Sequence, residues 1–176
     1  MDRWPSVILV HLPTELDDSV SEGVRMVAND LMRQGVPKEI FECYRAAEAI
    51  THVVLNQKNL LRFGRVQLYS SMCMDAATGS IVTVASDSTT EFVNSSLEKF
   101  IETAKAVIAR FPFYGEDDAQ EVTDRAVKEV TDAIRSVEES AFERDGFWAT
   151  LVDDIQMGDF ITEWIVSRPT VDLMRR

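Results

Sequence analysis

The sequence has few of the residues and motifs on which catalysis, metal binding or nucleotide binding usually depends. Its 176 residues include two histidines, two cysteines and seven glycines. The histidines form no HExxH motif, the cysteines form no CxxC pair, and the glycines form neither a GxGxxG nor a Walker loop. A Gly-x-Ser-x-Gly nucleophile elbow is missing as well. We therefore expect no catalytic residues, no cofactor and no metal, and we expect Cys73 to be a buried free thiol.

Long apolar runs and basic residues are also scarce. No stretch of about 18 apolar residues occurs, so a membrane-spanning helix is not expected. The apolar run at residues 7–10 is too short for the core of a signal peptide, and we expect a cytoplasmic location. Lys and Arg number 18 against 30 Asp and Glu, which gives a net charge of −12. This balance disfavours direct binding of nucleic acid, whose phosphates attract Lys and Arg, and it permits an acidic surface for a basic protein partner.

A hairpin at residues 66–85 forms the centre of the expected fold. Residues 66–74 alternate with period two, and residues 81–85 are rich in β-branched side chains, so both are expected to be strands. The loop between them ends at Gly79, which we expect to adopt a positive φ angle. A third short strand is expected at residues 91–93.

The period then changes to that of a helix. Apolar residues from Leu97 to Phe111 recur three or four positions apart and define one helical face. Ser95 and Glu98 have the spacing of a capping box, in which each side chain accepts a hydrogen bond from the backbone amide of the other. Capping accounts for the Ser95-Ser96 pair, and the sequence places no general base that would make either serine a nucleophile.

The amino-terminal part is expected to begin with an edge strand at residues 7–10. Residues 19–34 have helical periodicity, with Ser19 and Glu22 as a second capping box and Gly35 at the helix end.

The region that follows is ambiguous. Residues 38–49 fit a short helix and residues 50–55 fit a strand, and short apolar runs do not distinguish these two structures. A further strand is expected at residues 60–63, with Gly64 ending it.

The segment 116–145 is expected to be a long helix with an apolar stripe and acidic faces. It holds eleven acidic and four basic residues, an excess of seven negative charges. Neighbours such as Asp117 and Asp118, or Asp153 and Asp154, do not converge on one site of a helix, which indicates solvated surface rather than a catalytic pair. Six acidic residues are candidates for binding a partner: Asp117, Asp118, Glu121, Asp124, Glu138 and Glu139.

A shorter helix is expected to include Trp148 and to end near Gly158, with Trp148 packed in the core. Residues 160–166 cannot be assigned, and Trp164 within them is a further candidate for partner binding, because Trp is common in interface hot spots. The elements together predict an α+β fold in which residues 1–176 form a single domain. We expect an antiparallel sheet of about four to six strands with helices packed mainly on one face.

Three strings of residues along this fold also form a recognisable pattern. They are Cys73-Met74-Asp75, then Thr78-Gly79-Ser80-Ile81-Val82, then Phe92-Val93-Asn94-Ser95-Ser96-Leu97-Glu98-Lys99-Phe100. With Gly35-Val36-Pro37 and Phe147-Trp148, they resemble the signature of the SUKH superfamily, and most of all its bacterial immunity proteins. The resemblance covers roughly residues 15–160, and its motif residues include Thr78, Gly79, Asn94, Ser95, Ser96, Leu97 and Trp148.

The resemblance implies an immunity protein that binds a cognate polymorphic toxin and blocks it without catalysis. The toxins of such proteins are often nucleases or deaminases, which need a basic substrate groove. Our hypothesis is that the acidic segment binds such a groove. Two alternatives remain open: a small-molecule-binding, metal-binding or enzymatic domain, and an intracellular scaffold of the same fold.

Overall fold

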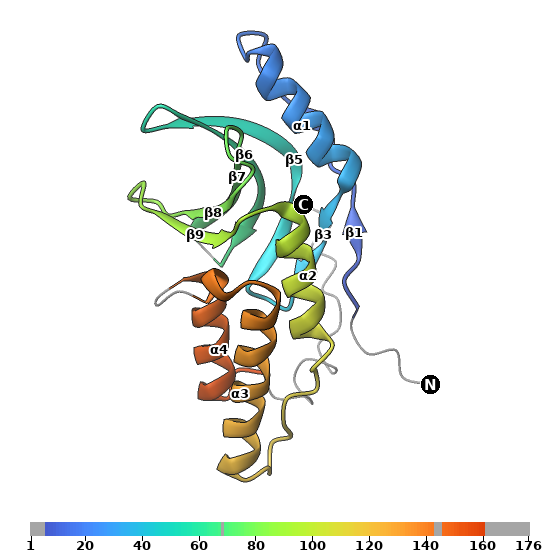
Figure 1. Cartoon of the computed structure of the whole chain (residues 1–176), viewed down its shortest axis with the longest axis vertical. Helices are drawn as coiled ribbons and strands as arrows, with labels where there is room; N and C mark the ends of the chain where they lie inside the picture. Colours follow the sequence, from blue (N-terminus) through green and yellow to red (C-terminus); the bar gives the residue numbers. More distant parts are fainter. Residues whose placement is uncertain (1–5, 68, 143–145, 161–176) are drawn as a thin grey trace, which may run out of the picture.

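The computed structural model describes residues 6–67, 69–142 and 146–160 (Figure 1). It contains short and long strands, four α-helices and one 3-10 helix. In chain order these are β1 (Leu9–Val10), β2 (Thr14–Glu15), α1 (Glu22–Gln34), β3 (Val36–Pro37), β4 (Glu39–Ile40), β5 (Tyr44–Leu55), β6 (Lys58–Val66), β7 (Ser70–Asp75), β8 (Ile81–Val84), β9 (Thr90–Asn94), α2 (Leu97–Ile108), α3 (Gln120–Val137), η1 (Glu139–Ala141) and α4 (Phe147–Met157).

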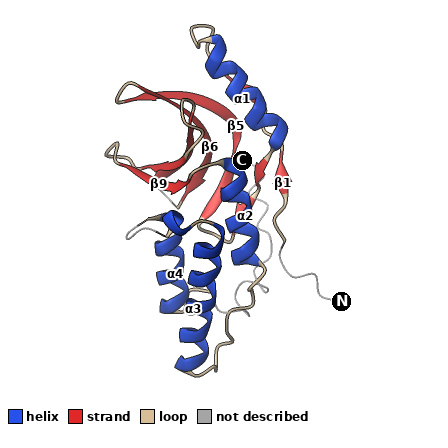
Figure 2. Ribbon diagram, in the orientation of Figure 1, coloured by secondary structure: helices blue, strands red, loops and turns tan. Residues whose placement is uncertain are grey.

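A strongly curved sheet is the largest feature, and it confirms the α+β class. Its strand order is β2-β5-β6-β7-β8-β9, and β4 also pairs with β5. All these pairings are antiparallel except that of β2 with β5. The sheet therefore has seven strands rather than four to six, because β2 and β4 are two-residue strands that periodicity cannot detect. Figure 2 shows α2, α3 and α4 together on one side of the sheet, while α1 lies near β1 and β5.

An aromatic cluster joins the sheet to two of these helices. Tyr44 on β5 and Phe63 on β6 have ring centroids 6.3 Å apart, and both rings contact Phe100 of α2. Phe100 in turn contacts Trp148 of α4, with centroids 5.9 Å apart. All four side chains are almost fully buried. Each such pair contributes about 0.5–1.5 kcal/mol beyond the burial of apolar area, so this cluster anchors α2 and α4 to the sheet.

The predicted centre of the fold is largely confirmed. Strands β8 and β9 and helix α2 lie where the sequence pattern placed them. Gly79 has a φ angle of 76°, and its amide donates to the carbonyl of Asp75 across the turn, at 2.8 Å. The first strand is shifted, because Val66 ends β6 and β7 begins only at Ser70. The apparent alternation over residues 66–74 therefore spans two strands and the turn between them.

Both helix starts differ from the predicted capping boxes. Helix α1 begins after Ser21 rather than Ser19, and α2 begins after Ser96 rather than Ser95. In each helix the capping hydroxyl accepts a hydrogen bond from the amide three residues on. The Ser95 amide donates instead to the carboxylate of Glu138, which is distant in sequence. Glu98 therefore does not cap this helix.

Residues 38–55 hold β4, a turn and β5, and the helical alternative for residues 38–49 is wrong. Strand β5 begins at Tyr44, and its register with β6 shifts between Ala46 and Thr51. This irregularity disrupts the period of two and explains why the sequence resembled a helix there. Gly64 lies inside β6, not at its end.

The long acidic helix is shorter than predicted at both ends. Helix α3 covers Gln120–Val137, so residues 116–118 precede it, and η1 follows it as a separate turn. Helix α4 ends at Met157, as expected, and Gly158 after it lies in the left-handed region. The strand expected at residues 7–10 is the two-residue β1, which pairs with β3 outside the main sheet.

Gly64 provides a test of the packing between β5 and β6. A Cβ atom at Gly64 would lie 2.3 Å from the Tyr44 ring. We expect Gly64→Ala to lower the free energy of unfolding by about 1–3 kcal/mol, since overpacking displaces a fully buried ring. The control is Gly23→Ala on the exposed surface of α1, where no atom lies within 4 Å. That change should raise stability by about 0.5–1 kcal/mol. Equal unfolding midpoints in urea for both variants would contradict this packing.

Candidate functional site

A buried asparagine organises the region where the sheet meets the helices. Asn94, at the end of β9, is 0% exposed. Its side-chain oxygen accepts a hydrogen bond from the Trp148 indole nitrogen of α4, at 3.0 Å. Its side-chain nitrogen donates to Glu138 at 2.8 Å and to the Thr103 hydroxyl of α2 at 3.3 Å. One side chain thus connects β9, α2, α4 and the junction between α3 and η1.

Glu138, which the sequence suggested as a partner-binding residue, completes this network. Its carboxylate accepts hydrogen bonds from the Ser95 amide, at 3.0 and 3.2 Å, as well as from Asn94 and the Ser140 hydroxyl. Partial burial by itself raises the pKa of Glu138, but the hydrogen bonds from Asn94 and Ser95 outweigh it and the net pKa is lowered. The carboxylate is therefore held in its charged form by contacts within the protein.

Four of the other predicted residues lie together around the amino-terminal end of α3. Asp117, Asp118, Glu121 and Asp124 are all exposed. Asp118 accepts a hydrogen bond from the Gly115 amide at 2.7 Å, which shapes the turn before the helix. Acidic groups at this end also interact favourably with the helix dipole.

The remaining candidates do not belong to this group. Glu139 is 81% exposed and forms an ion pair with Arg135 at 3.6 Å, beyond the carboxyl end of α3. The 18 residues of α3 separate the two ends by about 27 Å, at 1.5 Å per residue. Trp164 lies outside the described residues. Among the candidates within the described residues, the structure thus brings together only the group at the start of α3.

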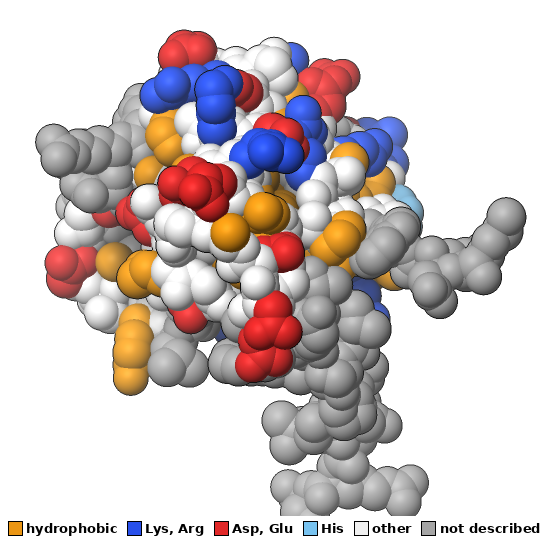
Figure 3. All heavy atoms as spheres, turned by 90° about the horizontal axis from the view of Figure 1, so that it is seen from below, with side chains coloured by type: hydrophobic (Ala, Val, Ile, Leu, Met, Phe, Trp, Pro, Cys, Tyr) orange, Lys and Arg blue, Asp and Glu red, His pale blue; other side chains and the backbone are white. Residues whose placement is uncertain are grey.

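The end of α4 lies close to the segment that leads into α3. The Tyr114 hydroxyl donates to the Ile155 carbonyl and accepts from the Phe160 amide. Asp153 and Asp159 are exposed there, and Met157 is 71% exposed. Figure 3 views this end of the molecule, where acidic side chains are spread over the face with apolar ones between them, and basic side chains gather toward one margin. The sequence pattern of each helix by itself did not predict that the end of α4 lies close to the segment leading into α3.

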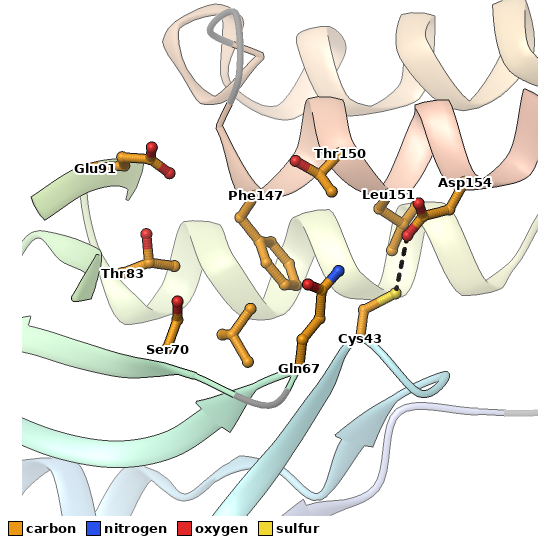
Figure 4. A pocket seen from close by; sticks show the side chains of 10 residues that line it. Cys43, Gln67, Ser70, Thr83, Glu91, Phe147, Thr150, Leu151 and Asp154 are labelled. Carbon is orange, nitrogen blue, oxygen red and sulfur yellow. Dashed lines mark hydrogen bonds between the residues drawn. The ribbon is translucent and has the colours of Figure 1, made fainter. Parts of the chain in front are cut away.

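A pocket of about 150 Å³ lies between α4 and the ends of the sheet strands (Figure 4). Helix α4 contributes four of the lining residues, and the others come from four separate parts of the sheet region. The lining residues are Cys43, Val66, Gln67, Ser70, Thr83, Glu91, Phe147, Thr150, Leu151 and Asp154.

Asp154 is the least expected group in this pocket, because its position next to Asp153 predicted solvated surface. It is partly buried, and the Cys43 thiol donates to its carboxylate at 3.9 Å. Burial raises the pKa of Asp154, and the nearby carboxylates of Asp159 and Asp153 raise it further. Burial and the Asp154 charge also raise the pKa of the Cys43 thiol to about 12, so this thiol is not a nucleophile at neutral pH.

The other residues with possible chemistry are engaged in structural contacts. Cys73 is a buried free thiol as predicted, and burial raises its pKa to about 12. His11 hydrogen-bonds the Met32 carbonyl at 3.0 Å, and His52 hydrogen-bonds Asn59 at 2.9 Å. Within the described ranges, no group of three or more His, Cys, Asp or Glu side chains is arranged to hold a metal ion. None of the helices described there is long and apolar enough to cross a membrane.

Comparison with known families now identifies the chain. Residues 13–154 match the family model of the SUKH-4 immunity protein, and the chain belongs to this family, a member of the SUKH superfamily. No curated protein and no solved structure matches the chain.

The Glu138 contacts generate a pH-dependent prediction. We expect Glu138→Gln to lower the free energy of unfolding at neutral pH by about 1–3 kcal/mol, because buried Asn94 loses a charged partner. The stabilisation from Glu138 is present above its ordinary pKa of 4.5 and is lost as the pH falls through the lowered value of the folded state. The difference between the wild type and the variant should therefore shrink in acid.

Glu139→Gln is the matched control, since it removes the same charge one residue away on the surface. We expect it to change stability by less than about 0.5 kcal/mol. Chemical denaturation from pH 3 to pH 7 measures both effects. If both variants lost the same free energy of unfolding at every pH, the contacts of Glu138 would not stabilise the fold more than those of Glu139.

Proposed function

We propose that this protein protects cells by binding a cognate polymorphic toxin and blocking it without catalysis. Membership of the SUKH-4 immunity protein family supports an immunity function. The observation that carries the proposed mode of binding is the group of exposed carboxylates at the start of α3, next to the exposed acids at the end of α4. We name these residues the acidic end; they are Glu116, Asp117, Asp118, Glu121, Asp124, Asp153 and Asp159.

Electrostatics explains how such a surface acts on a toxin. A nuclease or deaminase that acts on nucleic acid presents a basic groove to the phosphates of its substrate. The acidic end offers carboxylates to the same groove and so competes with the substrate. Complementary charges accelerate the encounter of two proteins and suppress wrong partners. We place this encounter in the cytoplasm, where free thiols such as Cys43 and Cys73 stay reduced.

A blocking mechanism requires no reactive group in the immunity protein. The described histidines hydrogen-bond within the protein, and burial holds both thiols in their protonated form. The carboxylates of the acidic end are therefore the groups we assign to toxin recognition.

Neutralising the start of α3 tests this assignment. We expect slower association with a catalytically inactive toxin domain encoded beside this protein's gene, and a weaker dependence of the rate on ionic strength. The physical reason is that exposed interface charges act mainly through the association rate. Surface plasmon resonance at several salt concentrations measures both. The changes are Asp117→Asn, Asp118→Asn, Glu121→Gln and Asp124→Asn.

The control makes the same change in net charge on the side of the molecule that carries α1, β2 and β5. Its four substitutions, all at exposed residues, are Glu15→Gln, Asp18→Asn, Glu22→Gln and Glu48→Gln. We expect this variant to associate nearly as fast as the wild type. If both variants slow association equally, net charge and not the acidic end governs the encounter, and the assignment is wrong.

A further inference from the structure

The pocket beside α4 has walls suited to a positively charged group. In Figure 4, Glu91 of β9 lies on one side and Asp154 of α4 on the other, and the Phe147 side chain reaches into the space between them. Gln67 and Thr150 add polar atoms to the lining. Among the described residues that line the pocket there is no Lys or Arg. The lining thus provides two carboxylates and several neutral acceptors without a cation of its own.

Asp154 is held under conditions that disfavour its charge. It is partly buried, Asp153 and Asp159 repel it, and in the part of the chain that the structure describes no Lys or Arg pairs with it. Among the described residues, the hydrogen bond to its side chain is the weak contact from the Cys43 thiol. Raised carboxyl pKa values of this kind concentrate at functional sites. A cation entering the pocket would remove the electrostatic penalty.

We propose that this pocket receives an arginine side chain of the toxin, with Asp154 as the pairing carboxylate. This inference rests on the proposed function and names the chemistry of one anchor in the interface. A planar guanidinium has five N–H donors, which suits a pocket with carboxylate, amide and hydroxyl acceptors. Its flat face also packs favourably on an aromatic ring such as Phe147. Arginine is among the residues that most often dominate interface energy when they enter a pocket.

A protein side chain is favoured over a bound metal ion for two reasons. The described residues form no group of three ligands that would hold a metal. The pocket also lies near the acidic end, because the charges of Asp153 and Asp159 on that surface act on Asp154. A toxin that covers the acidic end therefore has its own basic residues close to the pocket.

A small probe tests the pocket chemistry without the toxin. We expect Nα-acetyl-arginine methylamide to shift the backbone NMR signals of Thr150 and Asp154 saturably, while the uncharged citrulline analogue does not. Asp154→Asn should weaken this binding about tenfold, the loss typical of a charge-assisted hydrogen-bonded pair. Asp18→Asn is the control, because it makes the same change at an exposed position outside both the pocket and the acidic end, and it should bind as the wild type does. Equal shifts with the citrulline or lysine analogue would overturn the assignment to a guanidinium.

The same variants then separate this inference from the proposed function. With the inactive toxin domain, Asp154→Asn should raise the dissociation constant about tenfold and Asp18→Asn should leave it nearly unchanged. If the toxin binds the wild type and Asp154→Asn equally well, the pocket proposal fails while the immunity function stands. If no variant and no wild-type protein binds the toxin domain, the proposed function itself fails. If Asp154→Asn folds poorly, Glu91→Gln removes the other carboxylate of the pocket at an exposed position. This variant should also weaken binding.

Discussion

The hydrogen bonding of one buried amide is the constraint on which the arrangement of the carboxyl-terminal half depends. Asn94 uses both ends of its side chain, accepting from Trp148 and donating to Glu138 and Thr103. A buried polar group without partners costs about 1–3 kcal/mol, so this position is stable only when α2, α4 and the end of α3 lie where they do. The aromatic contacts of Phe100 with Trp148 and the sheet add apolar packing to the same junction.

The positions of the acidic end and the pocket follow from this junction. Helix α3 ends at this junction and α4 begins there, and the two helices pack against each other. The start of α3 is thereby directed away from the sheet, as Figure 1 shows. The start of α4 is held against the sheet, and the pocket forms where Thr150 and Asp154 face the strand ends.

The sequence predicted those elements whose signals are local. The turn at Gly79 and the helices α2 and α4 were recognisable because period and turn chemistry agree over a few residues. The first half of strand β5 fitted a helix in the sequence because its bulge breaks the alternation, whereas residues 50–55 fitted a strand. Capping was assigned to Ser95 because a sequence pattern cannot show that Ser96 meets the helix amides.

The candidate site was only partly predictable from the sequence, because several of its contacts join residues that are far apart along the chain. The exposed acids at the start of α3 follow from composition and helical spacing. Glu138 was assigned to the surface, although it contacts Asn94 from 44 positions further along the chain. The pocket combines residues from β9, α4 and the β6–β7 turn, and no local pattern links them.

The most direct measurement is amide hydrogen exchange of the protein, alone and in complex with a catalytically inactive form of its toxin. We predict that binding slows exchange in residues 114–124 and 147–159, which include the acidic end and the α4 wall of the pocket. Protection confined to α1 and the β1–β3 pair, with α3 and α4 unchanged, would contradict recognition through these helices.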